Sequence, residues 1–227
     1  MSLEDRARRE QRLSAQAAIV EGCRRCAIGS TRRNSVYGEG DPLAQLLVIG
    51  EGPGETEDQL GRPFVGRAGE LLDRMLLAIG LPREEVYIAN TVKCRPTLED
   101  GTRLRNRAPD PQEMANCRPY LDEQIEIIRP RVILALGAPA AKSFLGPQFS
   151  ITRQRGRWYE GPGDIPLMAS FHPAYILRLT GGEVNAVKRL VWDDLKAVRT
   201  RLDEPVRDVA PSGDASAAAV QPELFPE

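Results

Sequence analysis

Apolar segments of strand length alternate with longer amphipathic segments along most of this chain of 227 residues. Four runs are apolar at nearly every position: residues 46–50 (LLVIG), 86–90 (VYIAN), 132–137 (VILALG) and 167–173 (LMASFHP). Strands that are apolar on both faces are typical of parallel sheets covered by helices on both sides. The alternation therefore predicts a three-layer α/β/α fold around a central, mostly parallel, four-stranded sheet.

The segments between and around these runs have helical spacing of apolar residues. We expect helices over residues 4–22, 68–81, 111–130, 138–146 and 185–202. From about Pro205 the chain is rich in Pro, Ala, Ser and Asp and has no periodicity, which predicts a disordered tail. The expected organisation is one domain over residues 1–204, with an N-terminal helix and cysteine-bearing segments, followed by a disordered tail over residues 205–227.

The charge pattern limits the location and the partners of the protein. The net charge is only −1, so binding to nucleic acid would depend on local basic patches. The N-terminal segment MSLEDRARREQRLSAQ is polar, and it predicts neither a signal peptide nor a membrane anchor. We therefore expect a cytoplasmic protein without membrane contact, and nothing in the pattern demands more than a monomer.

The chain has four cysteines, and two of them form a C-x-x-C pair: Cys23, Cys26, Cys94 and Cys117. In a reducing compartment such a set indicates metal ligands rather than disulfides. Each cysteine has a basic neighbour, as in CRRC, KCRP and NCRP, and cations stabilise thiolates. The spacing does not choose between zinc and an iron-sulfur cluster, and four buried, inert thiols are the alternative.

The segment VIGEGPGETEDQLGRPFVG, residues 48–66, has the glycines of a phosphate-binding loop but the wrong charge. Four carboxylates within eight residues would repel an anion, no Lys-Ser/Thr pair follows, and Pro53 lacks the N–H that a phosphate would need. Acidic groups beside tightly turned backbone suit a site where positive charge develops or where water is held. A simple tight turn is the alternative.

Chemistry-bearing residues stand at the carboxyl ends of the expected strands. Glu51, Asn90, Gly137 and His172 follow or end the four runs, and all but Gly137 have side chains able to do chemistry. In parallel sheets, ligands bind beyond these ends of the strands. The sequence therefore predicts a site at this edge of the sheet.

Four segments together, GEGPGETEDQLGRPFVGRAG, VYIANTVKCRP, NCRPYL and FHPAYILR, closely resemble the iron-sulfur (family 4) uracil-DNA glycosylases of bacteria and archaea. The resemblance covers roughly residues 20–200. It implies the uracil-DNA glycosylase fold and hydrolysis of the N-glycosidic bond of deoxyuridine in DNA, which leaves an abasic site. It also implies a 4Fe-4S cluster on the four cysteines, with zinc as the alternative.

The resemblance assigns roles to residues around the predicted site. Asn90 would pair with the edge of uracil, and Phe64 would stack on the base after it leaves the duplex. His172, the one histidine of the chain, would donate a hydrogen bond to uracil O2. Gly52 and Gly54 would let the backbone approach the base closely. By residue type alone, the asparagine could cap a turn, the phenylalanine could belong to the core and the histidine could be structural.

The residue that activates water is left open by the resemblance. The best-known uracil glycosylases have an Asp where this chain has Gly52. We expect Glu51 to take the role, with Glu57 and Asp58 as the next candidates. All three carboxylates could instead form a solvated rim.

The segment PAYILR resembles the loop that enters the duplex behind the flipped nucleotide. Ile176 or Leu177 would be the wedge, and Arg178 would contact a phosphate. The segment between Cys94 and Cys117 is longer than usual for the family and basic, but it has no histidine, so we do not expect covalent trapping on DNA.

The tail contains QPELF at residues 221–225, which resembles the peptides that dock into the bacterial sliding clamp. Uracil-containing DNA and this clamp are therefore the expected partners, with the protein near the nucleoid of a bacterium. The alternative function is a DNA-binding or redox-sensing module on the same fold without catalysis, which the presence of Asn90 and His172 argues against.

Overall fold

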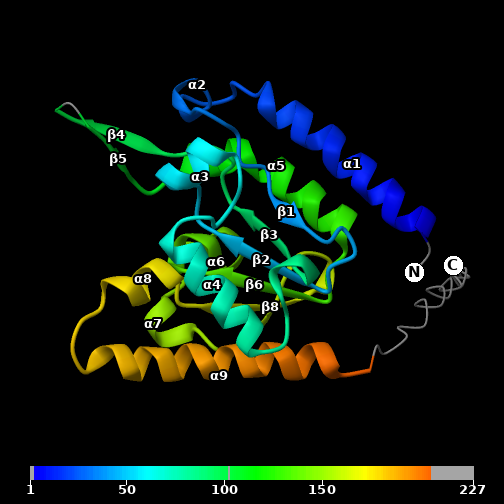
Figure 1. The fold of residues 1–227 in the computed structure, drawn as a ribbon, viewed down its shortest axis with the longest axis vertical. Coiled ribbons are helices and arrows are strands. Elements are labelled where there is room, and N and C mark those ends of the chain that lie inside the picture. The colour runs from blue at the N-terminus through cyan, green and yellow to red at the C-terminus, as the bar shows by residue number, and fades with distance from the viewer. Residues whose placement is uncertain (1–2, 102, 206–227) are drawn as a thin grey trace, which may run out of the picture.

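The computed structural model describes residues 3–101 and 103–205. In this part of the chain the main sheet has six strands in the order β1-β3-β2-β6-β8-β7 (Figure 1). Its strands are β1 (Glu39–Gly40), β2 (Leu46–Gly50), β3 (Tyr87–Asn90), β6 (Val132–Leu136), β7 (Trp158–Glu160) and β8 (Pro166–Ser170).

The sequence predicts four strands, whereas the described sheet has six; the four predicted strands form its centre. The strands β3, β2, β6 and β8 are parallel neighbours, as the apolar runs indicate. Two further strands, β1 and β7, pair antiparallel with β3 and β8 at the edges of the sheet. These edge strands have two and three residues. Segments so short carry no periodicity, so only the pairing with the neighbouring strand defines them.

Helices cover both faces of the sheet, as the sequence predicts. The longer ones are α1 (Leu3–Glu21), α4 (Arg67–Ala78), α5 (Pro111–Ile128), α6 (Ala138–Leu145) and α9 (Glu183–Asp203). The short ones are α2 (Ile28–Thr31), α3 (Glu55–Leu60), η1 (Arg83–Glu85), α7 (Ile151–Gln154), η2 (Pro162–Asp164) and α8 (Pro173–Arg178).

Alternate residues of each central strand belong to two separate cores. In β2, Leu47 and Ile49 pack with residues of α1, α5 and α6, whereas Leu46 and Val48 pack with residues of α4, α8 and α9. Because successive side chains of a strand point to opposite faces, a run that is apolar throughout needs a cover on each side. The three-layer α/β/α arrangement is therefore confirmed.

A hairpin projects from the body between Cys94 and Cys117, where the sequence indicates only an extended basic loop (Figure 1). Its strands are β4 (Thr97–Asp100) and β5 (Arg103–Asn106), which pair antiparallel. Gly101 has φ +62°, a conformation that favours glycine at the turn. Leu98 and Leu104 are both exposed, so no alternation of buried and exposed residues marks these strands in the sequence.

The last described helix, α9, ends at Asp203, close to the predicted domain boundary. Apart from Pro205, the expected tail over residues 205–227 lies outside the described residues, as does its QPELF segment. Among the helices that are described, none combines the length and the apolar character needed to cross a membrane.

Candidate active site

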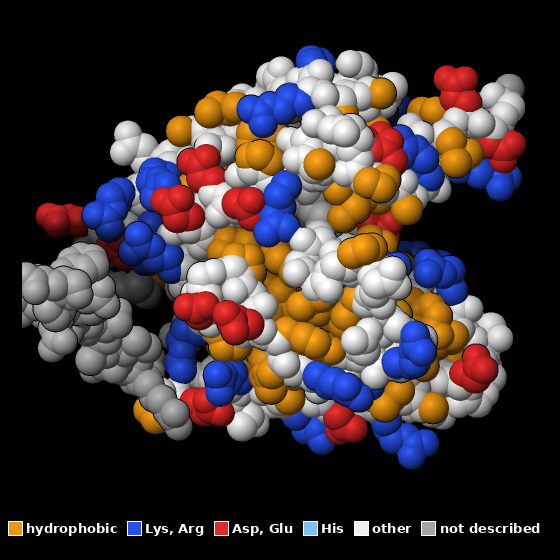
Figure 2. All heavy atoms as spheres, turned by 180° about the vertical axis from the view of Figure 1, so that it is seen from behind, with side chains coloured by type: hydrophobic (Ala, Val, Ile, Leu, Met, Phe, Trp, Pro, Cys, Tyr) orange, Lys and Arg blue, Asp and Glu red, His pale blue; other side chains and the backbone are white. Residues whose placement is uncertain are grey.

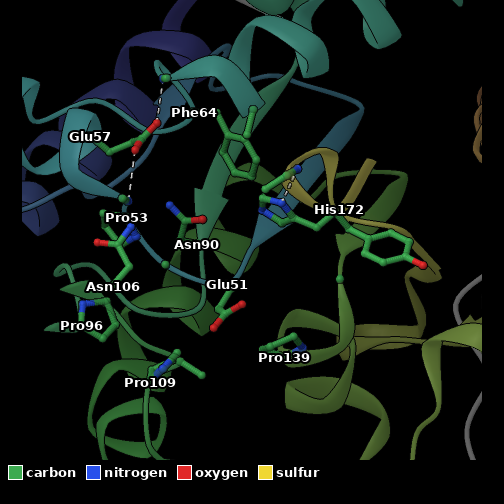
Figure 3. Close-up of a pocket in the computed structure, with 18 of the residues that line it drawn as sticks. Glu51, Pro53, Glu57, Phe64, Asn90, Pro96, Asn106, Pro109, Pro139 and His172 are labelled. Carbon is green, nitrogen blue, oxygen red and sulfur yellow. Dashed lines mark hydrogen bonds between the residues drawn. The ribbon is translucent and has the colours of Figure 1, made fainter. Parts of the chain in front are cut away.

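A pocket of about 760 Å³ lies at the carboxyl ends of the four parallel strands. Glu51, Asn90, Gly137 and His172 all line it, so the four predicted strand-end residues come together (Figure 3). The pocket also includes residues of the hairpin and of α8. Seen from the side opposite to Figure 1, the outline of the molecule is notched beneath the hairpin (Figure 2).

Asn90 is the last residue of β3 and is 1% exposed. In the described part of the chain its side-chain Oδ1 has no hydrogen-bond partner. A buried acceptor without a partner costs about 1–3 kcal/mol, so such an atom is expected where a ligand supplies the donor. The amide points toward the pocket in Figure 3. The arrangement suits recognition of a group that presents an N–H.

Gly50, which the sequence analysis did not select, makes room for the two neighbouring site residues. A Cβ at this position would lie 2.4 Å from Asn90 Oδ1 and 2.6 Å from Phe64 Cζ. Any other residue would displace one of the two side chains. Gly50 could have been selected from the sequence, because it ends an apolar strand directly before the acidic loop.

Phe64 lines the pocket and stacks on the imidazole of His172. The two ring centroids are 5.4 Å apart and the ring planes differ by 26°. Phe64 has φ +50°, a conformation that is uncommon for residues other than glycine. The ring is 6% exposed and also packs with the core of α4, so it belongs to the core while it lines the pocket.

His172 is the N-cap of α8, and its Nδ1 accepts a hydrogen bond of 3.1 Å from Ala174 N. An accepting Nδ1 leaves the proton of the neutral ring on Nε2. Burial lowers the pKa of His172 to about 4, and Arg178 acts in the same direction while Glu57 opposes it. At neutral pH the residue is therefore an uncharged donor through Nε2.

The three candidate carboxylates have different surroundings. Glu51 lines the pocket, and no group among the described residues hydrogen-bonds its carboxylate. Burial raises the pKa of Glu51, and the charge of Arg178 partly opposes that shift. Glu51 is thus the carboxylate that is open to a water molecule in the pocket.

Glu57 lines the pocket, but its carboxylate is occupied by backbone amides. It accepts hydrogen bonds from Gly54 N at 3.1 Å and from Val65 N and Gly66 N at 2.9 Å each. Asp58 is 4% exposed, does not line the pocket and accepts from Arg33 N at 3.0 Å. Both carboxylates therefore hold loops in place.

Gly52 and Gly54 line the pocket as expected, and both also give room to protein neighbours. A Cβ at Gly52 would lie 2.8 Å from Val92 Cγ2. One at Gly54 would lie 2.7 Å from Glu57 Oε2. Packing therefore favours glycine at position 52, whereas a side chain at position 54 would displace the Glu57 carboxylate.

The two wedge candidates on α8 lie on different sides of the helix. Ile176 is 5% exposed and belongs to the apolar core, whereas Leu177 is 39% exposed. Arg178 is exposed and lines the pocket. Of the two apolar residues, only Leu177 is available at the surface for insertion into a duplex.

The four cysteines gather in one region that joins the N-terminal segment to the start of the hairpin and to α5. Cys94 and Cys117 are buried, and Cys23 and Cys26 pack against the same core. Arg32 Nη1 lies 2.8 Å from Cys94 Sγ, and Lys93 N donates to Cys117 Sγ at 3.3 Å. Four thiols with cationic and amide donors at sulfur are a suitable set for a thiolate-ligated centre.

Among the described residues, no three His, Cys, Asp or Glu side chains are grouped to hold a metal ion. Burial raises the pKa of Cys94 to about 11 and also raises the pKa of Cys26 and of Cys117. These thiols are therefore neutral at pH 7 unless something binds the sulfur atoms.

Residues at the base of the hairpin also line the pocket, among them Arg107 and two that the sequence analysis did not select, Pro96 and Asn106. Arg95 Nε donates to Asn106 Oδ1 at 2.6 Å, and Arg107 forms an ion pair with Glu113 of α5 at 2.6 Å. These contacts fix the base of the hairpin beside the pocket. No local pattern marks them, because each depends on how the hairpin folds back onto α5.

Comparisons with known proteins agree with this geometry. The family model described as the uracil DNA glycosylase superfamily matches residues 37–196. A type-4 uracil-DNA glycosylase of Thermotoga maritima is 42% identical over 193 residues, 85% of this chain and 95% of that protein. One of Sulfurisphaera tokodaii is 40% identical over 83% of this chain and 84% of that protein. One of Archaeoglobus fulgidus is 42% identical over 70% of this chain and 79% of that protein.

Proposed function

The chain belongs to the uracil-DNA glycosylase superfamily and, within it, to the type-4 glycosylases, and from this premise we propose that it excises uracil from DNA at the pocket described above. The substrate is uracil-containing DNA. The reaction is hydrolysis of the N-glycosidic bond, and the products are free uracil and an abasic site.

The chemistry sets three requirements for the pocket. The oxygen of a water molecule bonds to C1′ of the sugar while the bond from C1′ to N1 of uracil breaks. The electron pair of the broken bond leaves with uracil, which then takes up a proton, and the attacking water gives up its own proton to a base. A site for this reaction must recognise the base, stabilise the departing anion and hold the water.

The observation that carries the proposal is Oδ1 of Asn90 at the pocket, which has no hydrogen-bond partner among the residues that the structure describes. Uracil presents N3–H between two carbonyl oxygens, so an amide side chain can accept from N3–H and donate to O4. Phe64, stacked beside this edge, would cover the face of the base. Cytosine has no proton on N3, so it could pair with this side chain only after the amide turned to exchange its oxygen and nitrogen.

His172 is proposed to donate through Nε2 to uracil O2, where negative charge grows as the base leaves. The support is its neutral form at pH 7 and its accepting Nδ1, which together define the tautomer. A neutral donor that is already oriented stabilises an anion without reorganisation in the transition state.

Glu51 is proposed to hold the water and to take its proton. Of the three candidate carboxylates it is the one in the pocket that is not occupied by backbone amides. Gly52 stands where the best-known uracil glycosylases have an Asp, so the carboxylate one position earlier is the nearest acidic group in the chain. Leu177 and Arg178 would contact the DNA backbone and the space left by the flipped base.

We propose that Cys23, Cys26, Cys94 and Cys117 hold a 4Fe-4S cluster, with zinc as the alternative. Such a cluster would supply a covalent link between the N-terminal segment and the segment that carries Asn90 and Cys94. Metal analysis and the visible absorption of purified protein distinguish iron from zinc.

Two expectations about partners remain proposals. The QPELF segment is proposed to bind the sliding clamp, and a tail peptide should bind it and lose binding after Leu224→Ala and Phe225→Ala. The protein is expected to act as a monomer at the nucleoid. Binding that is unchanged by the two substitutions would remove the clamp from the list of partners.

The test of the proposed function is incubation of the purified protein with a labelled oligonucleotide that contains one uracil, followed by alkaline cleavage of abasic sites. The control is the double variant Asn90→Ala, His172→Ala. Strand cleavage by the unaltered protein alone is expected. The absence of cleavage by protein with full metal content would favour the alternative, a DNA-binding or redox-sensing module without catalysis.

A further inference from the structure

The turn that carries Phe64 does not hold its conformation by its own preference. Phe64 has φ +50°, and its carbonyl lies so close to α4 that a Cβ at Gly69 would come within 1.8 Å of Phe64 O. A bulky residue in this backbone region persists only where its surroundings impose it. The contacts of residues 63–66, which we call the Phe64 turn, show what imposes it.

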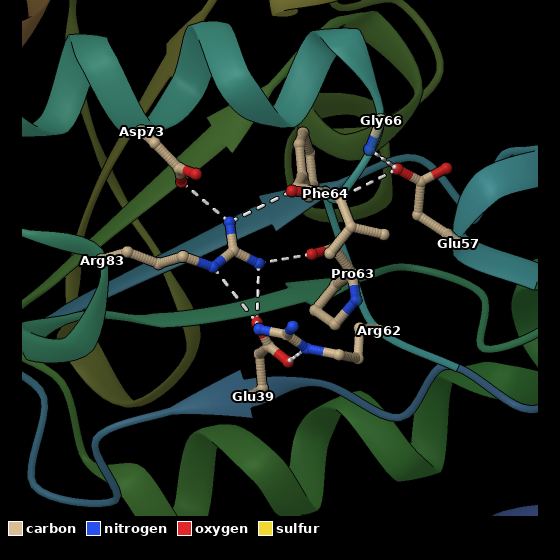
Figure 4. A network of polar contacts seen from close by, with 9 residues as sticks. Glu39, Glu57, Arg62, Pro63, Phe64, Gly66, Asp73 and Arg83 are labelled. Carbon is tan, nitrogen blue, oxygen red and sulfur yellow. Dashed lines mark hydrogen bonds and ion pairs between the residues drawn. The ribbon is translucent and has the colours of Figure 1, made fainter. Parts of the chain in front are cut away.

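Arg83, in the short helix η1, binds the carbonyl side of the Phe64 turn (Figure 4). Its Nη1 donates to Phe64 O at 3.1 Å, and its Nη2 donates to Pro63 O at 2.5 Å. The remaining donors reach Asp73 at 2.8 Å and Glu39 at 2.8 and 3.1 Å. All five N–H groups of the guanidinium are thus in use.

Glu57 binds the amide side of the same turn. Its Oε1 accepts from Val65 N and Gly66 N, the two residues after Phe64 (Figure 4). Four consecutive residues therefore each have one backbone group bound by an ionised side chain, two by a cation and two by an anion. The Phe64 ring is held between these two anchors, facing His172.

The carboxylates that balance the charge of Arg83 lie outside the pocket. Glu39 on β1 and Asp73 on α4 both contact the guanidinium, and Arg62 shares Glu39 at 2.8 Å. Arg83 does not line the pocket, and its side chain is 19% exposed. It therefore touches neither a base in the pocket nor the reacting atoms.

We propose that Arg83 is a positioning residue for base recognition: it fixes the Phe64 turn so that the ring can stack on the flipped uracil. The inference rests on the proposed function of the pocket and adds a residue outside it. Geometry matters here as well as charge, because only a planar guanidinium can donate to two successive carbonyls and two carboxylates at once.

The variants that test this are Arg83→Met and Arg83→Lys, with Arg62→Met as the matched control. Arg62 binds the same Glu39 but no backbone group of the Phe64 turn, and its side chain is 60% exposed. Binding of free uracil, the KM and kcat for uracil-containing DNA, and Tm are measured for each variant. Each Arg83 substitution is also combined with Phe64→Ala.

We expect both Arg83 variants to bind free uracil about tenfold more weakly, as loss of a base–aromatic stack implies, while Arg62→Met stays within twofold. In the Phe64→Ala background, the Arg83 substitutions should have no further effect on uracil affinity. If Arg83→Met does not fold, Arg83→Lys provides the same comparison.

Two results would overturn the proposal. One is an Arg83 variant with lowered Tm but unchanged uracil affinity, which indicates a role in stability alone. The other is an Arg83 effect that multiplies with that of Phe64→Ala, which indicates action through another group. Failure of the proposed function would look different from both results. In that case the unaltered protein itself would be inactive in the same assays.

Discussion

The Phe64 turn and the cysteine segments both place charged side chains next to groups to which we assign a role in the proposed function, but they differ in what those charges bind. In the turn, Arg83 and Glu57 bind backbone carbonyls and amides. In the cysteine segments, Arg32 lies against the sulfur of Cys94, and burial raises the pKa of three of the four thiols. The first region is held by groups of the protein itself, whereas the second is the region in which we propose that a bound cluster ionises the thiols.

The difference teaches that two kinds of order coexist in one fold. The pocket wall is set by hydrogen bonds that exist before any ligand arrives, which is the condition for electrostatic stabilisation without reorganisation. If the cysteine region binds the proposed cluster, its contribution to stability depends on that binding. Changes in the two regions should therefore separate activity from stability.

The largest effect is expected for His172→Ala, which removes the proposed donor to uracil O2. Loss of one preoriented donor to a developing anion reduces kcat by about 10²–10³-fold. Binding to uracil-containing DNA, measured separately, should persist, and Tm should stay close to that of the unaltered protein. A loss of activity below about tenfold would take His172 out of the mechanism.

The next effect is expected for Cys94→Ala, which tests the cysteine side of the comparison. We expect loss of bound metal and a Tm lower by about 10 °C, equivalent to about 3 kcal/mol for a domain of this size. Free uracil should still bind within about threefold, because the Phe64 turn is held by Arg83 and Glu57. Loss of uracil binding would show that the two regions are one cooperative unit, and it would contradict the independence of the Phe64 turn from the cysteine segments.

A smaller effect is expected for Arg178→Met, which changes the field in the pocket without removing a proposed catalytic group. Arg178 lowers the pKa of His172 and opposes the burial that raises the pKa of Glu51. Without Arg178, the pKa of His172 and the pKa of Glu51 both rise. At low pH the first shift leaves less neutral imidazole, and the second leaves less ionised carboxylate. The acid limb of kcat/KM against pH should therefore move to higher pH.

The control for this profile is Leu177→Ala, a neighbouring exposed residue that carries no charge. It should lower activity, if at all, by the same factor at every pH. An acid limb that stays in place after Arg178→Met would contradict either the role of Glu51 or the effect of the Arg178 charge on the pocket.

The smallest effect is expected for Asp110→Ala at the start of α5, the helix that carries Cys117. Asp110 is the N-cap, and its carboxylate accepts from Glu113 N at 2.8 Å. Loss of such a cap costs about 1 kcal/mol, or roughly 2–4 °C in Tm. Uracil excision should be unchanged. A clear loss of activity would indicate that the geometry of the pocket depends on the hairpin and α5 as well as on the Phe64 turn.

The prediction of fold and site from sequence succeeded where the pattern was repeated and local. Four apolar runs identified the parallel strands, and the carboxyl ends of such strands necessarily meet at one edge of the sheet. Glu51, Asn90 and His172 therefore share a pocket, as expected. The edge strands β1 and β7 were missed because two or three residues hold no period.

What the sequence determined by itself was the sheet, its two covers and the edge at which the site lies, since each follows from spacing along the chain. Only the tertiary structure decided which carboxylate is open to the pocket. Glu57 and Asp58 are adjacent in the chain, yet one binds Gly66, nine residues away, and the other binds Arg33, at a separation of 25. Arg83 likewise reaches Pro63 from 20 residues away. Such partners meet only when the chain is folded, so their hydrogen bonds leave no periodic pattern in the sequence.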